Sequence, residues 1–407
     1  MQEFIINEFI TLKLEDGKTN IYVLGKKFIQ CKYLLLNIPA QDLNLYDEIN
    51  SIDEAAEKLD KSLERSNPKS FEIEVPREVE FWGHSSNLQV WAEHGYDTRF
   101  IHSNLAFPLL KKLTEVGDIK AKRIFKDEIG KRFEMGSDSV RQFLALEGYL
   151  DYLSREEMWS VMPNQSEVRI LRVIEKEAGA EFKFCSDGME VFIWGDEPNQ
   201  LAFSIKDSHV KRIEFFNFNI LSVAKWENIF AMLGKLEALK ELHLPHNNLK
   251  SIPDSVRRIK NLEVLHLNNN ELKNIPEDIG DLEKLIWLVL KYNMIKKLPE
   301  SIGKLQLLRI LNLHHNQLVE LPNSIGNLKF LKKLNLENNR LEKLPDTIIE
   351  MESLAQFALS SNLLSDLPKK MIKMKSLRSI GLVGNKIIKS SPIIALLKKK
   401  GVSVRMK

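Results

Sequence analysis

The sequence has very few cysteines. Only Cys31 and Cys185 occur in 407 residues, far apart and without the spacing of metal ligands. A disulfide framework is therefore not expected, and the scarcity is typical of proteins from a reducing compartment. Cys31 lies between Ile29 and Tyr33 on one face of a predicted strand, which favours a buried, unreactive thiol over a nucleophile.

Long apolar runs are also missing. Apolar stretches such as residues 33–38 are far shorter than the roughly 20 residues that a helix needs to span a bilayer. The N-terminal residues MQEFIINEFI contain no basic segment ahead of the apolar residues, so a secretory signal is not expected. Together with the cysteine count, this predicts a cytoplasmic protein.

Nucleotide-binding fingerprints are absent as well. No Walker or dinucleotide motif occurs, and Gly280, Gly303 and Gly326 recur at a fixed interval that is typical of periodic turns. No basic stripe with interleaved aromatic residues is present, so nucleic-acid binding is not expected. The sequence predicts no cofactor, no metal ion and no catalytic residues.

Charge is distributed unevenly along the chain. Residues 1–238 contain 30 Lys and Arg against 40 Asp and Glu, a net charge of −10. Residues 239–407 contain 29 against 16, a net charge of +13, and the two values sum to the +3 of the whole chain. The N-terminal part is therefore acidic and the C-terminal part is basic.

The C-terminal part repeats itself every 23 residues. Leucines follow the pattern L-x-x-L-x-L from Leu239 onward, and prolines recur at the same interval from Pro253 to Pro368. An asparagine closes each leucine pattern, at Asn247, Asn270, Asn293, Asn316, Asn339, Asn362 and Asn385. A fixed period of this length is the signature of a solenoid.

Each element of the repeat has a physical reason. The leucine segment predicts a short strand, and strands of successive repeats stack into one parallel sheet. The asparagine amide can donate and accept, so the asparagine column is expected to bond buried backbone groups of adjacent turns. Helix 392–400 and strand 401–405 are predicted to cap one end, and a degenerate repeat at residues 209–221 the other.

The repeat resembles the 23-residue LPxxIxxLxxLxxLxLxxNxL subclass of the leucine-rich-repeat family, which includes Ras-binding scaffolds and plant Ras-group repeat proteins. The resemblance implies an α/β leucine-rich-repeat solenoid with a curved parallel sheet, seven repeats and caps. It also implies a non-enzymatic adaptor or scaffold that binds a protein on its concave face, with a Ras-like small GTPase as one partner class.

Four regions are predicted along the chain: an α+β domain at 1–75, a helical domain at 76–160, an α+β connector at 161–238, and the repeats at 239–407. A hairpin is expected around the Glu15-Asp16-Gly17 turn, and a helix from Ser137 to Leu153. The block EFWGHSSNLQVWAEHGYDTR resembles a region that precedes the repeats in Asgard-archaeal leucine-rich-repeat proteins, a region without an assigned activity.

An alternative function places an enzymatic or metal-dependent activity in the N-terminal half, with the repeats selecting the substrate. Its candidates are His84, His94 and His102, which lie near Trp91 and Asp97. His84, Trp91 and His94 fit one helix face, so the pattern favours packing in a core or interface over a metal or catalytic site.

The partner surface follows from the repeat geometry. The third, fifth, seventh and eighth positions of L-x-x-L-x-L-x-x-N are expected to face the concave side, where five of the nine histidines fall. Exposed aromatic residues at such positions are typical of interface hot spots. The predicted site lies on the first four repeats and contains Glu241, His243, His246, His266, Trp287, Val289, Lys291, Tyr292, Ile310, His314 and His315.

Overall fold

The computed structural model describes residues 2–29, 76–101, 103–185, 198–218, 221–387 and 391–406. Cys31 and His102, discussed above, lie outside these ranges. The chain forms two compact units. The first unit comprises residues 1–133 and 149–158, and the second comprises residues 134–148 and 159–407.

The first unit contains a small antiparallel sheet in which neighbouring strands are consecutive in the chain. Its central hairpin closes at Asp16 and Gly17, both with positive φ (52° and 70°), which is the backbone that a tight turn requires. The hairpin lies where the sequence predicts it. The strands are β1 (Gln2–Ile5), β2 (Ile10–Glu15), β3 (Lys18–Val23) and β4 (Lys26–Phe28).

Helices α2 (Arg77–Glu93), α3 (Ser103–Glu115) and α4 (Ile119–Met135) complete most of the first unit. Trp91 is fully buried, and its ring lies 4.7 Å from that of Tyr96. His94, the residue that follows α2, is exposed, and its ring lies 4.9 Å from that of Phe100.

The helix predicted from Ser137 to Leu153 is shorter in the structure. Helix α5 (Asp138–Leu146) ends just before Gly148, which adopts a left-handed φ of 69° that an α-helix cannot contain. The 3₁₀ helix η3 (Tyr149–Tyr152) and helix α6 (Arg155–Ser160) follow. Glycine supplies the sharp change of direction that the apolar spacing alone does not reveal.

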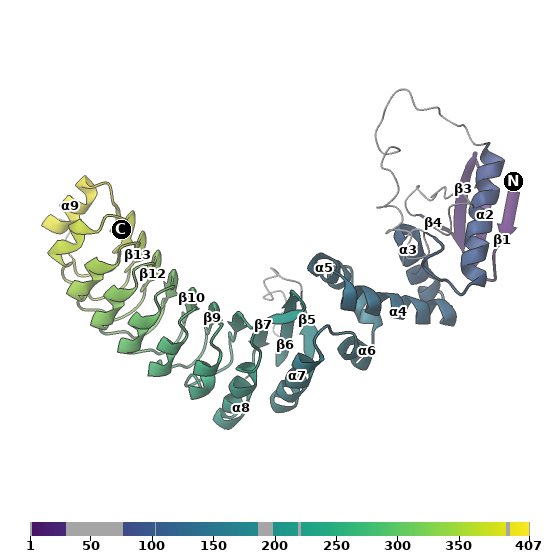
Figure 1. Ribbon diagram of the computed structural model, residues 1–407. Helices are drawn as coiled ribbons and strands as arrows, with labels where there is room; N and C mark the ends of the chain where they lie inside the picture. Colours follow the sequence, from purple (N-terminus) through teal and green to yellow (C-terminus); the bar gives the residue numbers. More distant parts are fainter. Residues whose placement is uncertain are drawn as a thin grey trace, which may run out of the picture. The chain divides into compact units, whose positions relative to one another are not determined.

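The second unit is built on an eleven-stranded sheet whose order follows the chain from β5 to β15 (Figure 1). All neighbouring strands are parallel except β6 and β7. The strands that precede the repeats are β5 (Phe182–Phe184), β6 (Gln200–Lys206) and β7 (His209–Phe216). The parallel sheet expected from the leucine pattern is confirmed.

The remaining strands of this sheet contain three residues each and pair in register with a 23-residue offset from β8 to β14. They are β8 (Glu241–His243), β9 (Val264–His266), β10 (Trp287–Val289), β11 (Ile310–Asn312), β12 (Lys333–Asn335), β13 (Gln356–Ala358), β14 (Ser379–Gly381) and β15 (Ser403–Arg405).

Short 3₁₀ helices form the opposite side of the array, each directly after a proline that has no N–H to leave unpaired (Figure 1). A Cβ on Gly303 would lie 2.5 Å from the carbonyl oxygen of Ser324, so glycine is needed there for close stacking. These helices are η5 (Asp254–Arg258), η6 (Glu277–Asp281), η7 (Glu300–Lys304), η8 (Asn323–Asn327), η9 (Asp346–Glu350) and η10 (Lys369–Lys373).

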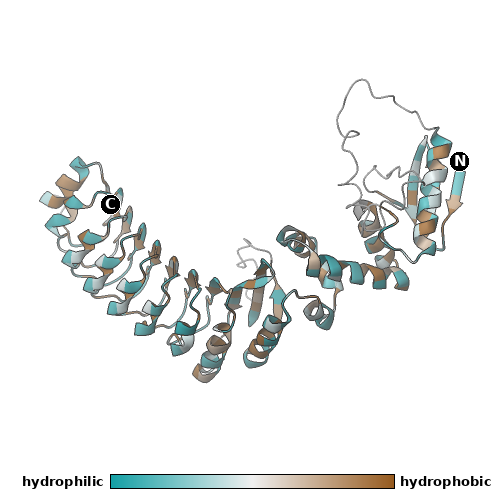
Figure 2. Cartoon of the chain, viewed as in Figure 1, coloured by the Kyte–Doolittle hydropathy of each residue, from teal (hydrophilic) through white to brown (hydrophobic). Residues whose placement is uncertain are grey.

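Longer helices cover both ends of the array. Helices α7 (Gln165–Ala178) and α8 (Val223–Leu233) lie before the first repeat, and α8 is largely apolar (Figure 2). The insertion of α8, which buries Trp226 and Phe230, explains why the spacing between β7 and Leu239 exceeds one repeat. Helix α9 (Pro392–Lys399) and strand β15 close the other end, as predicted. No helix in the described ranges is long and apolar enough to cross a membrane.

The asparagine column joins each repeat to the one before it. Asn293 donates from Nδ2 to the carbonyl oxygens of Leu267 (2.9 Å) and Leu290 (3.0 Å), and its Oδ1 accepts from the backbone N–H of Leu272 (3.0 Å). The same bonds recur at the other positions, and Asn247 bonds the Phe218 N–H and the Phe215 carbonyl of the cap. These side chains are buried except for Asn385, which is half-buried, and the backbone groups they bond lie away from water.

We predict that Asn293→Ala or Asn316→Ala lowers the free energy of unfolding by about 1–3 kcal/mol, because buried backbone groups lose their partners. Denaturant unfolding of the full chain measures the change. Lys296→Ala, on an exposed position of the same repeats, is the matched control and should leave stability unchanged. Equal midpoints for the asparagine variants and the parent would contradict a structural role for the column.

Candidate protein-binding surface

The concave face is formed by the first and third residues of each repeat strand, since the middle residue points into the core. In β10, Leu288 is fully buried while Trp287 is 44% exposed and Val289 is partly exposed. Val264 and Ile310 flank Trp287 in the sheet. These three side chains form an apolar stripe across the middle of the predicted surface.

An aromatic cluster lies beside this stripe. The rings of Tyr292 and His315 stack with centroids 4.5 Å apart and planes inclined by 15°. His314 meets both rings edge-on, at 5.5 Å from Tyr292 and 4.1 Å from His315. The Lys291 Nζ lies 6.0 Å from the Tyr292 ring centroid, at the outer range of a cation–π contact.

The eighth position of the repeat has an unusual backbone. Every residue there has a positive φ, between 54° and 74° from the first repeat to the last: His246, Asn269, Tyr292, His315, Asn338, Ser361 and Gly384. Asparagine and glycine adopt this left-handed conformation readily, whereas a bulky tyrosine does so at an energetic cost. Tyr292 and His315 therefore occupy positions where the backbone alone would favour asparagine or glycine.

Charged side chains fill the end of the concave face that is formed by β7 and β8. Arg212 and Glu214 on β7 are buried and form an ion pair, and Glu241 on β8 lies 4.0 Å from the Arg212 Nε. Arg212 and Glu214 are not among the residues that the sequence predicts for the site, because β7 lacks the leucine pattern that marks concave positions in the repeats.

Two predicted site residues, His243 and His266, belong to this charged cluster. His243 is only 7% exposed and lies 3.4 Å from Glu241, so its side chain is largely withdrawn from a partner. Its ring packs edge-on against His266 at 4.4 Å. Neighbouring strands are only about 5 Å apart, so imidazoles at equivalent positions pack on each other.

Burial changes the acid–base behaviour of the cluster. Burial lowers the pKa of His266 to about 3, with His243 and Arg212 acting in the same direction. Burial raises the pKa of Glu214 against the opposing effect of Arg212, whereas the hydrogen bond from His243 lowers the pKa of Glu241. Within the described ranges, no group of three or more His, Cys, Asp or Glu side chains is arranged to hold a metal ion.

The predicted residues His246, Lys291 and His314 lie at the edge of the concave face where the chain leaves the strands. His246 is exposed, and its ring lies 5.4 Å from that of Phe216. Burial lowers the pKa values of His246 and His314, and Lys291 lowers both further. The far end of the face presents small or polar side chains instead: Lys333, Gln356 and Ser379 in the first strand position, and Asn335, Ala358 and Gly381 in the third.

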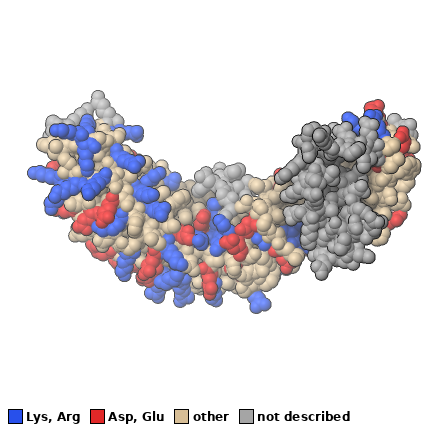
Figure 3. Space-filling model, turned by 45° about the horizontal axis from the view of Figure 1, so that its top comes forward, with Lys and Arg blue, Asp and Glu red and all other residues tan. Residues whose placement is uncertain are grey.

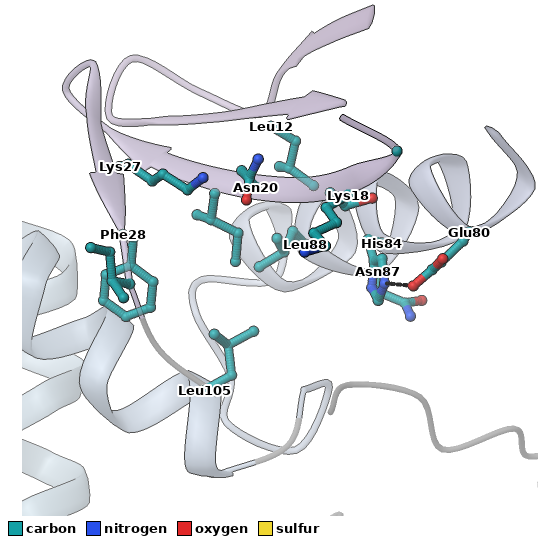
Figure 4. Close-up of a pocket in the computed structure, with 14 residues that line it drawn as sticks. Leu12, Lys18, Asn20, Lys27, Phe28, Glu80, His84, Asn87, Leu88 and Leu105 are labelled. Atoms are coloured by element: carbon teal, nitrogen blue, oxygen red, sulfur yellow. Dashed lines mark hydrogen bonds and ion pairs between the residues drawn. The ribbon is translucent and has the colours of Figure 1, made fainter. Parts of the chain in front are cut away.

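The first unit contains a pocket of about 450 Å³ between β3 and α2. Figure 4 shows His84 and Glu80 at its rim, with the His84 Nε2 and the Glu80 Oε1 3.4 Å apart, and Leu88 and Leu105 further inside. Lys18 and Lys27 reach it from the sheet. His84 and Glu80 are one helical turn apart on α2. Pairs of oppositely charged side chains at this spacing are common on helix surfaces, so the pair does not by itself indicate a catalytic site.

These features define a solenoid of 23-residue repeats with an aromatic concave surface. A family model described as leucine-rich repeat region matches residues 203–316 and 299–399. The match supports the leucine-rich-repeat family for the array, including β7 and α8, which precede the regular repeats. Among curated proteins, none matches the chain.

Solved structures with similar parts include a leucine-rich-repeat protein of Leptospira interrogans, with 30% sequence identity and a TM-score of 0.43 over 48% of this chain. An internalin from Listeria monocytogenes is 17% identical over 50% of this chain, with a TM-score of 0.39. The plant peptide hormone receptor RGFR1, in complex with RGF2, is 23% identical over 38%, with a TM-score of 0.33. The matched parts span 48%, 53% and 30% of those three chains.

We predict that the second unit loses stability as the pH falls from about 6.5 toward 3. The folded-state pKa of His266 is lowered to about 3, so the unfolded chain takes up the proton first and acidification favours unfolding. Chemical denaturation at several pH values should show a smaller loss for His266→Gln than for the parent. The same pH dependence in both proteins would show that His266 does not cause it.

Proposed function

We propose that the chain is a non-enzymatic cytoplasmic adaptor whose concave repeat face binds a folded protein. The proposed contact centre consists of Trp287, Tyr292 and His315, with Val264 and Ile310 beside them. The leucine-rich-repeat fold is suited to this role, because its curved sheet presents side chains of many strands to one partner.

The observation that carries the proposal is the pair of bulky residues at left-handed backbone positions. Tyr292 and His315 have φ values of 57° and 54°, where Asn269 and Asn338 occupy the equivalent positions in neighbouring repeats. Strain of this kind costs on the order of 1–3 kcal/mol for a residue such as tyrosine and is concentrated at functional sites, whereas histidine, like asparagine, is enriched in this conformation. Neither ring is needed for the core, which is formed by the leucines.

Exposure and composition support the same surface. Trp287 and Tyr292 are each 44% exposed, and both belong to the residue types that dominate binding hot spots. The apolar stripe is bordered by the charged cluster at Glu241 on one side and by Lys333 on the other. A partner surface that fits it combines an apolar centre with charged or polar groups at its rim.

The partner class to test first is a Ras-like small GTPase. This choice rests on the resemblance of the repeat to the Ras-binding subclass and therefore on analogy of fold. Binding of purified small GTPases in both nucleotide states, measured by calorimetry, would test it. If no small GTPase binds, the GTPase is rejected as the partner class. Binding of another folded protein that is lost in a Tyr292 variant would still support the concave site.

We predict that Tyr292→Asn abolishes partner binding while the free energy of unfolding stays unchanged or rises by up to about 1 kcal/mol, because asparagine relieves the left-handed strain. Trp287→Ala should weaken binding by about 2 kcal/mol or more without changing the unfolding midpoint. Calorimetric titration and denaturant unfolding of the same protein samples measure both quantities.

The matched control is Asn338→Ser, which changes the equivalent position two repeats away from Tyr292 to a residue that Ser361 shows to be compatible with the backbone. It should bind like the parent. If Tyr292→Asn and Trp287→Ala also bind like the parent, while Lys296→Ala or Lys343→Ala on the opposite side prevents binding, the proposed surface is wrong.

A further inference from the structure

All charged residues in the last part of the chain are basic. From Leu367 to Lys407 the sequence contains 12 Lys and Arg residues and no Asp or Glu. Ten of these basic residues lie in the described ranges, and all ten are exposed. We call them the basic cap: Lys369, Lys370, Lys373, Lys375, Arg378, Lys386, Lys398, Lys399, Lys400 and Arg405.

Figure 3 shows this end of the array covered by Lys and Arg side chains. The convex part of the cap is continuous, because α9 packs on η10. Lys400 fixes this contact by donating from Nζ to the carbonyl oxygens of Ile372 and Met374, both at 2.6 Å. The lysines of η10 and those at the end of α9 are therefore held on neighbouring elements.

Several basic residues of the earlier repeats form ion pairs with carboxylates of the next repeat. Arg257 lies 3.4 Å from Asp278, and Lys329 lies 3.7 Å from Glu350 on the neighbouring 3₁₀ helix. Among the described side chains of the basic cap, by contrast, no ion pair occurs. Clustered like charges repel each other, so folding of the array does not explain this composition.

Helix α9 adds an apolar group to the charged surface. Ile393, Ile394 and Leu397 are buried against the array, whereas Pro392, Ala395, Leu396 and Lys399 point outward at helical spacing. Leu396 is 45% exposed, and Lys398, Lys399 and Lys400 follow it after the buried Leu397. Figure 2 shows the apolar character of this helix at the end of the array.

We propose that the basic cap binds the anionic surface of a phospholipid membrane, with Leu396 entering the interface between headgroups and acyl chains. A charged bilayer is an extended surface that attracts clustered lysines and arginines without a shaped pocket. It also accepts a single exposed leucine on a short helix, which strengthens the electrostatic contact. The cap would thereby hold the array at a membrane while the concave face engages its own partner.

The composition of the cap disfavours nucleic acid as the partner. Recognition of single strands relies on aromatic side chains that stack on bases, and residues 367–407 contain no Phe, Tyr, Trp or His. The exposed Leu396 would have no role in contacting phosphates. A membrane surface accounts for both the charge and the leucine.

Co-sedimentation of the full chain with vesicles tests the proposal. We expect binding to phosphatidylcholine vesicles that contain about 30 mol% phosphatidylserine, and none to phosphatidylcholine alone. Each lysine near such a surface contributes about fivefold in affinity. The affinity of the fourfold variant Lys370→Gln, Lys373→Gln, Lys398→Gln, Lys399→Gln for these vesicles should therefore fall about 600-fold, and binding should weaken as salt is raised.

The matched control changes the same net charge in the ion-paired repeats: Arg257→Gln, Lys260→Gln, Lys297→Gln and Lys329→Gln. It should retain vesicle binding. Leu396→Ser should weaken binding, whereas Leu307→Ser, which alters a leucine of similar exposure (49%) away from the cap, should not.

Two outcomes would overturn the proposal. One is equal binding of the two fourfold variants to anionic vesicles, which would show that the position of the charges is irrelevant. The other is binding of a DNA duplex as tight as that of vesicles and insensitive to Leu396→Ser, which would make the cap a general polyanion-binding surface. Neither outcome depends on the concave site, because both experiments use the chain without its partner.

Discussion

The stacking of each repeat on its neighbour is the constraint on which the rest of the second unit depends. A 23-residue repeat buries too little apolar surface to fold alone, so its open faces must be covered by the repeats before and after it. The asparagine column makes this stacking possible in a buried environment. Each amide bonds a carbonyl of the preceding repeat, as Asn293 does with Leu267, and accepts from a backbone N–H there, as from that of Leu272.

The same turn geometry connects stability to the proposed function. The residue before each asparagine of the asparagine column adopts a left-handed backbone conformation, which limits the side chains that fit there without strain. Tyr292 and His315 occupy this position in adjacent repeats, and their rings stack because the register fixes their separation. A structural requirement of the fold thus places two large rings side by side on the concave edge.

The array contains three regions that differ in how their charged side chains are paired. Near α8 the charges are buried and mutually compensated, as Arg212 and Glu214 show, and His266 remains neutral because burial lowers its pKa. In the middle repeats, surface cations pair with carboxylates of the next repeat. At the far end, residues 367–407, which include the lysines of η10 and α9, contain no Asp or Glu. The net positive charge of residues 239–407 is therefore concentrated in residues 367–407.

The sequence by itself determined the period, the parallel sheet, the asparagine column and the C-terminal cap, because each depends on a residue type repeated at a fixed interval. It also identified Trp287 and Tyr292 as concave residues. It did not reveal α8, Arg212 or Glu214, which lie outside the repeat pattern. Only the tertiary structure decided that His243 is buried and that Tyr292 is left-handed, because side-chain exposure and φ arise from packing between strands that are 23 residues apart.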